Sequence, residues 1–294
     1  MRIALVCPYA WEAAGGVQVH VRSLATRLRD RGHDATVLTP AGIPPAEPWV
    51  RAVGRPLRVP YRGTVASIAP QSFLRTRDVL AALRPDVVHI HEPLTPSASM
   101  FAALASSAPV VATVHAYLDR SRAMELSAPL LRRVWAKVAT GIAVSEAAAS
   151  FLRRTLPEVA LEIVPNGVDV DAFASADPRG DLPDGRRILW VHRLDAQKGF
   201  PIALAAFSKV LAAVPDAVLV VIGEGGDRES LGLLTAAERE RVEMRGTVAN
   251  ADVPGYLAGS DVSVNPAVGQ ESFGIVLVEA MAAGVPVVAS DIPG

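Results

Sequence analysis

The feature that most constrains the fold is a regular alternation of short apolar runs and amphipathic helical segments. In the first half of the chain, strands are predicted at 3–7, 35–38, 87–90, 110–113, 142–144 and 162–164, and helices at 17–31, 71–83, 97–106, 123–140 and 145–154. Apolar strands separated by helices are typical of parallel sheets that are covered on both faces. The sequence therefore predicts an α/β fold with doubly wound sheets.

The alternation of predicted strands and helices is interrupted once and then resumes. Residues 172–187 are rich in Asp, Pro and Gly, which is typical of a linker. Beyond them, strands are predicted at 188–191, 217–222, 242–245, 262–265 and 285–289, and helices at 202–214, 230–239, 253–258 and 275–283. We therefore predict an N-terminal domain at 1–171, a linker at 172–187 and a C-terminal domain at 188–294. Because ligands bind at the carboxyl ends of such strands, a cleft between the domains is the expected active site.

Composition excludes several classes of protein. The net charge of the 294 residues is −1, which argues against a nucleic-acid partner. Cys7 is the only cysteine, so we expect no internal disulfide and a reducing compartment. The apolar N-terminus lacks a convincing cleavage site, and no apolar run is long enough to span a membrane. We expect a cytoplasmic protein. Since the chain stops just after a strand, we also expect its C-terminal domain to be truncated.

Residues 269–279, GQESFGIVLVE, place two carboxylates around the start of a predicted helix. Glu271 precedes the helix, and Glu279 lies between one and two turns inside it, where it can face the same side. The backbone N–H groups at a helix N-terminus favour phosphorylated and polyhydroxylated ligands. The alternative is an ordinary capping loop with a solvated glutamate.

Two cations and two glycines follow the first strands of the two halves. Arg193 and Lys198 come directly after the first strand of the second half, where they can clamp a diphosphate. The alternative is a solvated loop with one ion pair to Asp195. Gly15 and Gly16 follow the first strand of the chain, where a phosphate could approach the backbone. A plain tight turn is the other interpretation of these glycines.

Histidines cluster at two predicted strand ends. His89, His91 and Glu92 end one strand, and His115 follows the next. No second group at ligand spacing completes a metal site, so we predict that no metal is bound. A hydrogen-bonding role for His115 at the mouth of the cleft fits the pattern better.

Six arginines and no acidic residue lie between Arg51 and Arg77, with Tyr61 and Phe73 among them. The predicted helix at 71–83 carries apolar residues on one side and Arg75 and Arg77 on others, as an interfacial helix does. This local excess of charge predicts an anionic partner or membrane surface. The alternative is a solvated, arginine-rich face.

Several motifs together resemble the retaining glycosyltransferases of family 4, which have the GT-B fold of two facing Rossmann-like domains. They are GGVQVHV, HIHEP, VPNGVD, R-x4-KG, and the E-x7-E element followed by MAAGVPVVAS. Within the family, the stretches CPYAWEAAGGVQVHV, VPYRGTV and HIHEPLTPSASM are similar to those of actinobacterial phosphatidylinositol mannosyltransferases. The resemblance implies a nucleotide-sugar donor, GDP-mannose, and a phosphatidylinositol-like lipid acceptor on the cytoplasmic face of the plasma membrane. No cofactor or metal is implied.

The resemblance also implies roles for individual residues. Gly16 would admit the β-phosphate of the donor, Arg193 and Lys198 would neutralise the leaving diphosphate, and His115 would lie beside the reacting sugar. Glu271 would hold sugar hydroxyls and Glu279 the ribose. The remaining donor-site residues would be Gly15, Ser272, Phe273, Gly274 and Ile275, and the acceptor-site residues would be Tyr9, Gln18, Tyr61 and Arg62.

The chain departs from the family at a few positions. His192 and Gln270 stand where the family usually has glycine, and Arg62 stands where the related mannosyltransferases carry asparagine. Two other functions stay open at this stage. One is a family 4 transferase that uses a UDP-sugar and a soluble acceptor. The other is a non-catalytic, two-lobed protein that binds a sugar or nucleotide, although such a protein has no need to neutralise a leaving diphosphate.

Overall fold

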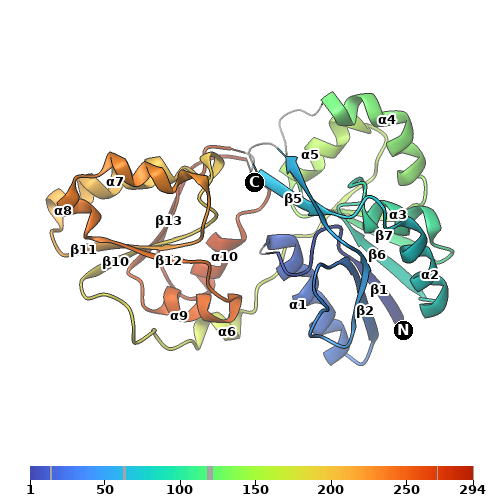
Figure 1. Cartoon of the computed structure of the whole chain (residues 1–294), viewed down its shortest axis with the longest axis horizontal. Coiled ribbons are helices and arrows are strands. Elements are labelled where there is room, and N and C mark those ends of the chain that lie inside the picture. Colours follow the sequence, from blue (N-terminus) through green and yellow to red (C-terminus); the bar gives the residue numbers. More distant parts are fainter. Residues whose placement is uncertain (14, 62–63, 118–121, 270, 294) are drawn as a thin grey trace. The chain divides into compact units, whose positions relative to one another are not determined.

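The computed structural model describes residues 1–13, 15–61, 64–117, 122–269 and 271–293. The chain divides into two compact units, Met1–Asn166 and Gly167–Pro293, and each is built around a parallel sheet with helices on its faces (Figure 1). The predicted α/β fold with doubly wound sheets is therefore confirmed.

The N-terminal unit has a seven-stranded parallel sheet in the order β3-β2-β1-β6-β7-β8-β9. The strands are β1 (Arg2–Val6), β2 (Asp34–Pro40), β3 (Val50–Gly54), β6 (Val87–His91), β7 (Val110–Val114), β8 (Val138–Ala143) and β9 (Glu162–Ile163). The chain runs from β1 outward to β3 on one side and then returns to β6 on the other. The direction of winding therefore switches between β1 and β6, which is where ligands bind in open α/β sheets.

Helices cover this sheet because successive strand side chains point to opposite faces. The helices are α1 (Gly16–Asp30), α2 (Phe73–Leu83), α3 (Ala98–Ala105), α4 (Arg122–Trp135) and α5 (Glu146–Thr155). Leu5 and Cys7 of the β1 segment pack with Val21 and Ala25 of α1 in one apolar cluster. Burial raises the pKa of the Cys7 thiol to about 12, so this cysteine is an uncharged core residue.

The arginine-rich segment contains strands that the sequence pattern did not predict. Besides β3, it forms an antiparallel hairpin of β4 (Leu57–Tyr61) and β5 (Thr64–Ile68). The prediction of one helix over 123–140 is also wrong, because α4 ends at Trp135 and β8 begins at Val138. Gly141 lets β8 pass the end of α4 at close range, because a Cβ there would lie 2.7 Å from the Trp135 ring.

The C-terminal unit has a five-stranded parallel sheet in the order β12-β11-β10-β13-β14. The strands are β10 (Arg186–Val191), β11 (Ala217–Ile222), β12 (Val242–Gly246), β13 (Val262–Asn265) and β14 (Val287–Ala289). The α-helices are α6 (Val170–Ala174), α7 (Phe200–Ala213), α8 (Ala236–Arg239), α9 (Val253–Ala258) and α10 (Ile275–Ala282). Three short 3-10 helices are η1 (Ala196–Lys198), η2 (Gly226–Leu233) and η3 (Asn250–Asp252). Here the winding switches between β10 and β13.

Both faces of this second sheet are filled by large apolar side chains. Trp190 of β10 packs with Phe200 and Phe207 of α7 on one face. Its neighbour Leu189 packs with Tyr256 of α9 and Ala280 of α10 on the other. Figure 1 shows α7 on one side of the sheet and α9 and α10 on the opposite side. The core therefore fixes the loops at the carboxyl ends of β10 and β13.

Part of the segment predicted as a linker packs against the C-terminal unit and is hydrogen-bonded to it. α6 occupies its beginning and packs against α9 and α10. Arg179 donates its backbone N–H to the Gly255 carbonyl over 3.2 Å, and its guanidinium lies 4.7 Å from the centre of the Tyr256 ring. No helix within the described ranges is long and apolar enough to cross a membrane.

Candidate active site

Three loops meet at the carboxyl ends of β10, β11 and β13, where the second sheet switches direction. The loop at 192–199 is joined to the β11 loop by a hydrogen bond from the Leu194 N–H to the Glu224 carbonyl, 3.0 Å long. It is joined to the β13 loop by a bond from the Val268 N–H to the Gln197 carbonyl, 2.9 Å long. The loops that carry the predicted clamp and the predicted carboxylate are therefore held together by backbone contacts.

Gly199 makes this close approach possible. Its φ is +71°, and a Cβ at this position would lie 2.0 Å from the carbonyl oxygen of Pro266 in the β13 loop. Only glycine fits such a contact at a left-handed backbone position. Gly199 thus ends η1 directly after Lys198 and lets α7 begin.

Lys198 and Glu271 form a short ion pair across these loops. The ammonium nitrogen lies 2.6 Å from Oε2 of Glu271, and the side chains are only 21% and 14% exposed. The other oxygen, Oε1, accepts the N–H groups of Ser272 and Gly274 at 3.2 and 3.1 Å. Burial opposes ionisation of Glu271, but Lys198 and the Gly274 N–H outweigh it and hold the pKa of this carboxyl below its ordinary value. Glu271 is therefore a charged residue at the entrance to α10.

Arg193 is linked to the same turn through Asp195. Its guanidinium lies 3.3 Å from Oδ2 of Asp195, and the Arg193 side chain is 55% exposed. Oδ1 of Asp195 accepts the Lys198 backbone N–H at 3.3 Å, which caps η1. The ion pair expected from the solvated-loop interpretation is therefore present. Yet it also ties Arg193 to the turn that carries Lys198, so the two cations share one loop.

Glu279 differs from Glu271 in its surroundings. It lies within α10, and burial raises its pKa to about 7. The carboxyl group is therefore about half protonated near neutral pH, whereas Glu271 is ionised. The surroundings thus shift the pKa values of the two carboxyl groups of the motif in opposite directions.

We expect glutamine substitutions at these two positions to change stability in opposite directions. The folded protein holds the Glu279 proton up to about pH 7, so wild-type stability falls as pH rises from 4.5 through 7. Glu279→Gln removes this loss and should raise the free energy of unfolding at pH 8, relative to pH 5, by at most about 3 kcal/mol. Glu271→Gln should instead lower the free energy of unfolding at both pH 5 and pH 8, because the stability from its ionised form is present above pH 4.5. Denaturant unfolding at both pH values measures this, and changes of the same sign for the two variants at pH 8 would contradict it.

In the N-terminal unit, the predicted phosphate site lies where β1 gives way to α1. Gly15 is the extended N-cap residue and Gly16 the first helical residue. Apart from its chain neighbours and its own helix backbone, a Cβ on Gly16 would meet no atom of the described residues within 4 Å, so these residues leave the space beside Gly16 open. The buried amide of Gln18 donates to the Ala10 carbonyl over 3.2 Å, and the Tyr9 carbonyl accepts the Thr39 hydroxyl at 2.8 Å. Gln18 and Tyr9 are therefore both anchored next to this open end of α1.

Two residues predicted for the acceptor site cannot be placed in the same way. Tyr61 ends β4, where it pairs with Thr64, but only its backbone belongs to the described part of the chain. Arg62 lies outside the described residues. So does Gln270, one of the departures from the family pattern.

Four histidines gather at the carboxyl ends of β6 and β7. His91 Nδ1 lies 2.9 Å from His115 Nε2, and His89 stacks on His91 with ring centres 4.5 Å apart. His20 of α1 meets the His91 and His115 rings edge-on, at 5.4 and 5.1 Å. The sequence pattern predicted no role for His20, although it lies about one helical turn after Gly16 and so on the same side of α1.

These histidines are neutral at physiological pH. Burial lowers the pKa of His20, and burial together with His20 lowers the pKa of His89 to about 4. Burial also holds the pKa values of His91 and His115 well below the ordinary range. One ring of the His91–His115 pair must then donate and the other accept.

The histidine cluster has some of the properties of a metal site. One ring nitrogen from each of His20, His91 and His115 lies within 4.8 Å of the others. However, the His91 and His115 nitrogens are 2.9 Å apart in a hydrogen bond. Two imidazole ligands on tetrahedral zinc, with bonds of about 2.0–2.1 Å, stand roughly 3.3 Å apart. The geometry is that of a hydrogen-bonded pair.

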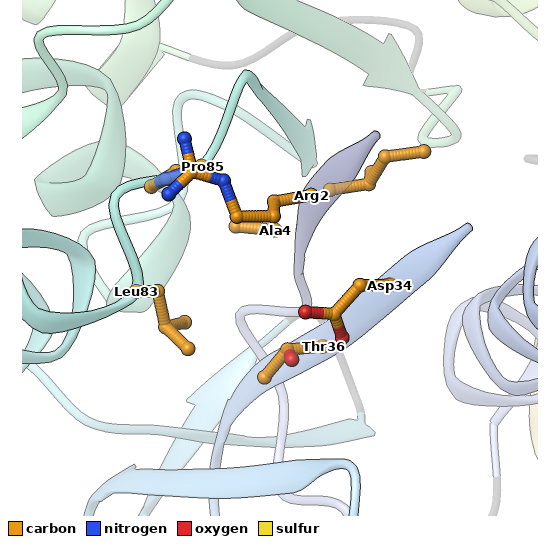
Figure 2. Close-up of a pocket in the computed structure, with 7 residues that line it drawn as sticks. Arg2, Ala4, Asp34, Thr36, Leu83 and Pro85 are labelled. Carbon is orange, nitrogen blue, oxygen red and sulfur yellow. The ribbon is translucent and has the colours of Figure 1, made fainter.

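A small pocket lies at the other end of the first sheet (Figure 2). It is lined by Arg2 and Ala4 of β1, Asp34 and Thr36 of β2, and Leu83 and Pro85 after α2. Beside it Arg2 pairs with Asp86 at 2.8 Å. These are the amino ends of the strands, away from the histidines and Gly16, so this pocket is not part of the candidate site.

Comparisons with known proteins cover both units. Residues 14–172 match the family model described as Glycosyltransferase Family 4, and residues 185–294 match that described as Glycosyl transferases group 1. The chain is 40% identical to a phosphatidyl-myo-inositol mannosyltransferase of Mycolicibacterium smegmatis, covering 99% of this chain and 76% of that protein. It is 34% identical to the protein of the same name from Propionibacterium freudenreichii, covering 99% and 77%.

Solved structures share the fold at lower identity. Sucrose-phosphate synthase from Thermosynechococcus elongatus matches with a TM-score of 0.73 and 22% identity, over 100% of this chain and 82% of that one. Anabaena HepE, in complex with UDP and glucose, matches with a TM-score of 0.72 and 19% identity, over the same shares. The architecture is that of the GT-B glycosyltransferases. With family models matched in both units and relatives up to 40% identical along its length, the chain belongs to glycosyltransferase family 4 and is a glycosyltransferase.

Proposed function

We propose that this protein transfers mannose from GDP-mannose to a phosphatidylinositol-like lipid with retention of the anomeric configuration. The observation that carries the proposal is the 40% identity to a phosphatidyl-myo-inositol mannosyltransferase over 99% of the chain. The likeness extends through the loops that hold Lys198 and Glu271 as well as the histidine cluster.

On the donor side, the proposal is based on the positive charges of the loop that follows β10. Arg193 and Lys198 neutralise the diphosphate as its bond to the anomeric carbon breaks, a kind of electrostatic stabilisation that often dominates catalysis. This function needs no metal ion. Glu271 accepts sugar hydroxyls, and Glu279 accepts those of the ribose. The backbone of Ser272, Phe273, Gly274 and Ile275 lies against the donor.

The reaction proceeds by attack on the same face that the diphosphate leaves, through an oxocarbenium-like state. The acceptor hydroxyl forms its bond to the anomeric carbon, and its proton passes to the departing diphosphate. Gly15 and Gly16 admit the β-phosphate to the N-terminus of α1, whose positive end favours it. His115 lies beside the sugar as a neutral hydrogen-bonding group.

On the acceptor side, Tyr9, Gln18, Tyr61 and Arg62 contact the polar head of the lipid. The arginine-rich segment supplies an anionic-membrane surface. Leu57, Arg58, Phe73, Leu74, Arg75 and Arg77 are all exposed on β4 and α2. Leu80 of the same helix is buried in the core, so the membrane-facing side of α2 is narrower than its sequence suggested. Exposed apolar and cationic side chains side by side are typical of interfacial binding.

The membrane contact predicts selective binding to anionic vesicles. Each cation near an anionic surface contributes about 1 kcal/mol, so changing Arg58, Arg75 and Arg77 to serine should weaken binding about 10²-fold. Arg77 also pairs with Asp78 at 2.8 Å, but an exposed pair of this kind is weak, so Arg77 can exchange this partner for a lipid phosphate. Co-sedimentation with phosphatidylserine-containing and pure phosphatidylcholine vesicles measures the effect.

The matched control changes three other exposed arginines of the same unit, Arg27, Arg31 and Arg133, to serine. Arg27 lies in α1, Arg31 caps the C-terminus of α1 and Arg133 lies in α4. The control therefore removes the same amount of charge from other places and should leave binding intact. Equal binding to both kinds of vesicle, or equal loss in the two triple variants, would mean that the segment is only a solvated face.

A donor panel tests the donor assignment. The full chain is incubated separately with GDP-mannose, UDP-glucose and UDP-N-acetylglucosamine, with and without phosphatidylinositol vesicles, and release of the nucleoside diphosphate is measured. The proposal predicts release from GDP-mannose, accelerated by the lipid. Preferential turnover of a UDP-sugar would instead favour the alternative transferase with a soluble acceptor.

A further inference from the structure

Glu92 has an unusual backbone for its residue type. It directly follows β6, and its φ is +52°. Among the described non-glycine residues, only Arg84 shares a positive φ with it. Left-handed conformations are strained for residues with a Cβ and persist where the surroundings hold them in place.

The surroundings of Glu92 are formed by the neighbouring strand. Its N–H donates to the Thr113 carbonyl of β7 over 2.8 Å, and its own carbonyl accepts the Thr95 N–H at 3.1 Å. From the turn that these hydrogen bonds form, the Glu92 carboxylate reaches the two residues that follow β7. Oε1 accepts the backbone N–H groups of His115 and of Ala116, the latter at 2.7 Å.

His115 is therefore held from β6 in two ways. Its ring bonds to His91, the last residue of β6, over 2.9 Å. Its backbone N–H bonds to the carboxylate of the next residue, Glu92. His91 is itself fixed, since its carbonyl accepts the Ser99 hydroxyl at 2.6 Å. A carboxylate that accepts two adjacent N–H groups defines the path of the backbone, much as a helix cap does.

We propose that Glu92 is a positioning residue that fixes His115 for sugar transfer by clamping the two backbone N–H groups at the end of β7. This inference rests on the proposed function, in which His115 lies beside the sugar. Glu92 does not touch the substrate in this role. With its backbone in the left-handed conformation, its side chain reaches the two residues that follow β7.

The charge of the carboxylate is less important than its acceptor oxygens. Burial raises the pKa of Glu92, and the N–H groups of His115 and Ala116 act against this. A glutamine keeps an acceptor oxygen at the same reach, whereas alanine and glycine remove it. Glycine also relieves the strain of the positive φ, which alanine does not. The glutamine variant thus tests the charge, the alanine variant tests the hydrogen bonds to the two N–H groups, and the glycine variant tests these bonds without the backbone strain.

The test combines kinetics with a structural signal that does not depend on activity. Glu92→Gly and Glu92→Ala should each lower kcat for mannosyl transfer about 10²-fold, as a displaced catalytic group does. The KM for the donor should stay unchanged, and Glu92→Gln should recover most of kcat. In ¹⁵N NMR spectra, the amide protons of His115 and Ala116 should move upfield in the Gly and Ala variants and stay near their wild-type positions in the Gln variant.

Two results would overturn the inference. One is wild-type kcat in Glu92→Gly, whose backbone is unstrained. The other is unchanged amide positions of His115 and Ala116 in both truncated variants. A wild-type kcat in His115→Ala would instead refute the role of His115 in the proposed function. The amide shifts still report whether Glu92 clamps this backbone, so the two failures are distinguishable.

Discussion

Alanine at Arg193 or Lys198 should lower turnover about 10²–10³-fold, a loss of about 2.7–4 kcal/mol of transition-state stabilisation, by analogy with removal of one oxyanion donor. Both cations lie on the loop after β10, and Asp195 ties them together through its two oxygens. In the proposed mechanism they face the charge that develops on the leaving diphosphate. The affinity for free GDP should fall as well, because the diphosphate carries this charge before and after transfer.

The two variants differ in their structural side effects. Arg193 is more than half exposed, and Arg193→Ala breaks its ion pair with Asp195, which at 3.3 Å is longer than the 2.6 Å pair of Lys198 with Glu271. Lys198 neutralises the mostly buried Glu271, so Lys198→Ala also leaves a carboxylate without its partner and should destabilise the protein. Thermal unfolding measured beside kinetics separates the two effects. Lys209→Ala on α7 removes an equally positive, exposed residue and serves as the control. Near-normal turnover in both Arg193 and Lys198 variants would refute the clamp.

Valine at Gly16 should abolish measurable turnover while the fold stays intact. The reason is steric: a branched side chain at the first residue of α1 would occupy the place where the β-phosphate meets the backbone. Apart from its chain neighbours and its own helix backbone, a Cβ placed on Gly16 would have no atom of the described residues within 4 Å, so this part of the chain tolerates the side chain. Gly16→Ala should have a smaller effect, since one methyl group fills less of this space.

Gly232→Val is the matched control for Gly16→Val. Gly232 lies in η2 and likewise has no atom within 4 Å of its Cβ position. Its replacement should leave turnover unchanged. Steady-state kinetics and circular dichroism of both variants are the measurements. Retained activity with unchanged donor KM in Gly16→Val would show that no phosphate approaches this glycine.

The sequence predicted most of the fold because the sheets consist of apolar runs. β11, β13 and α9 have the predicted bounds. The hairpin of β4 and β5 was not predicted because its strands are short and mix apolar residues with polar ones such as Arg58, so no apolar run marks them. The end of α4 at Trp135 was not predicted because the helical sequence pattern continues beyond it. The pairing of β8 with β7 overrides this pattern.

The sequence predicted which residues belong to the candidate site better than it predicted which of them contact one another. The E-x7-E spacing placed Glu271 before α10 and Glu279 inside it, as found. That Lys198 pairs with Glu271, 73 residues away in the sequence, follows only from the adjacency of β10 and β13. In the same way, no local pattern shows that His20 meets His91 and His115, or that Glu92 reaches across to β7. Such contacts depend on which strands lie side by side.

Mannosyl transfer to phosphatidylinositol can be tested by identifying the product. The full chain is incubated with radiolabelled GDP-mannose and phosphatidylinositol vesicles, and the lipid fraction is separated and digested with α- and with β-mannosidase. We expect a labelled lipid whose mannose is released by the α-specific enzyme alone, because the configuration of the donor is retained. Label that stays in water-soluble products, or a lipid cleaved only by the β-specific enzyme, would contradict it.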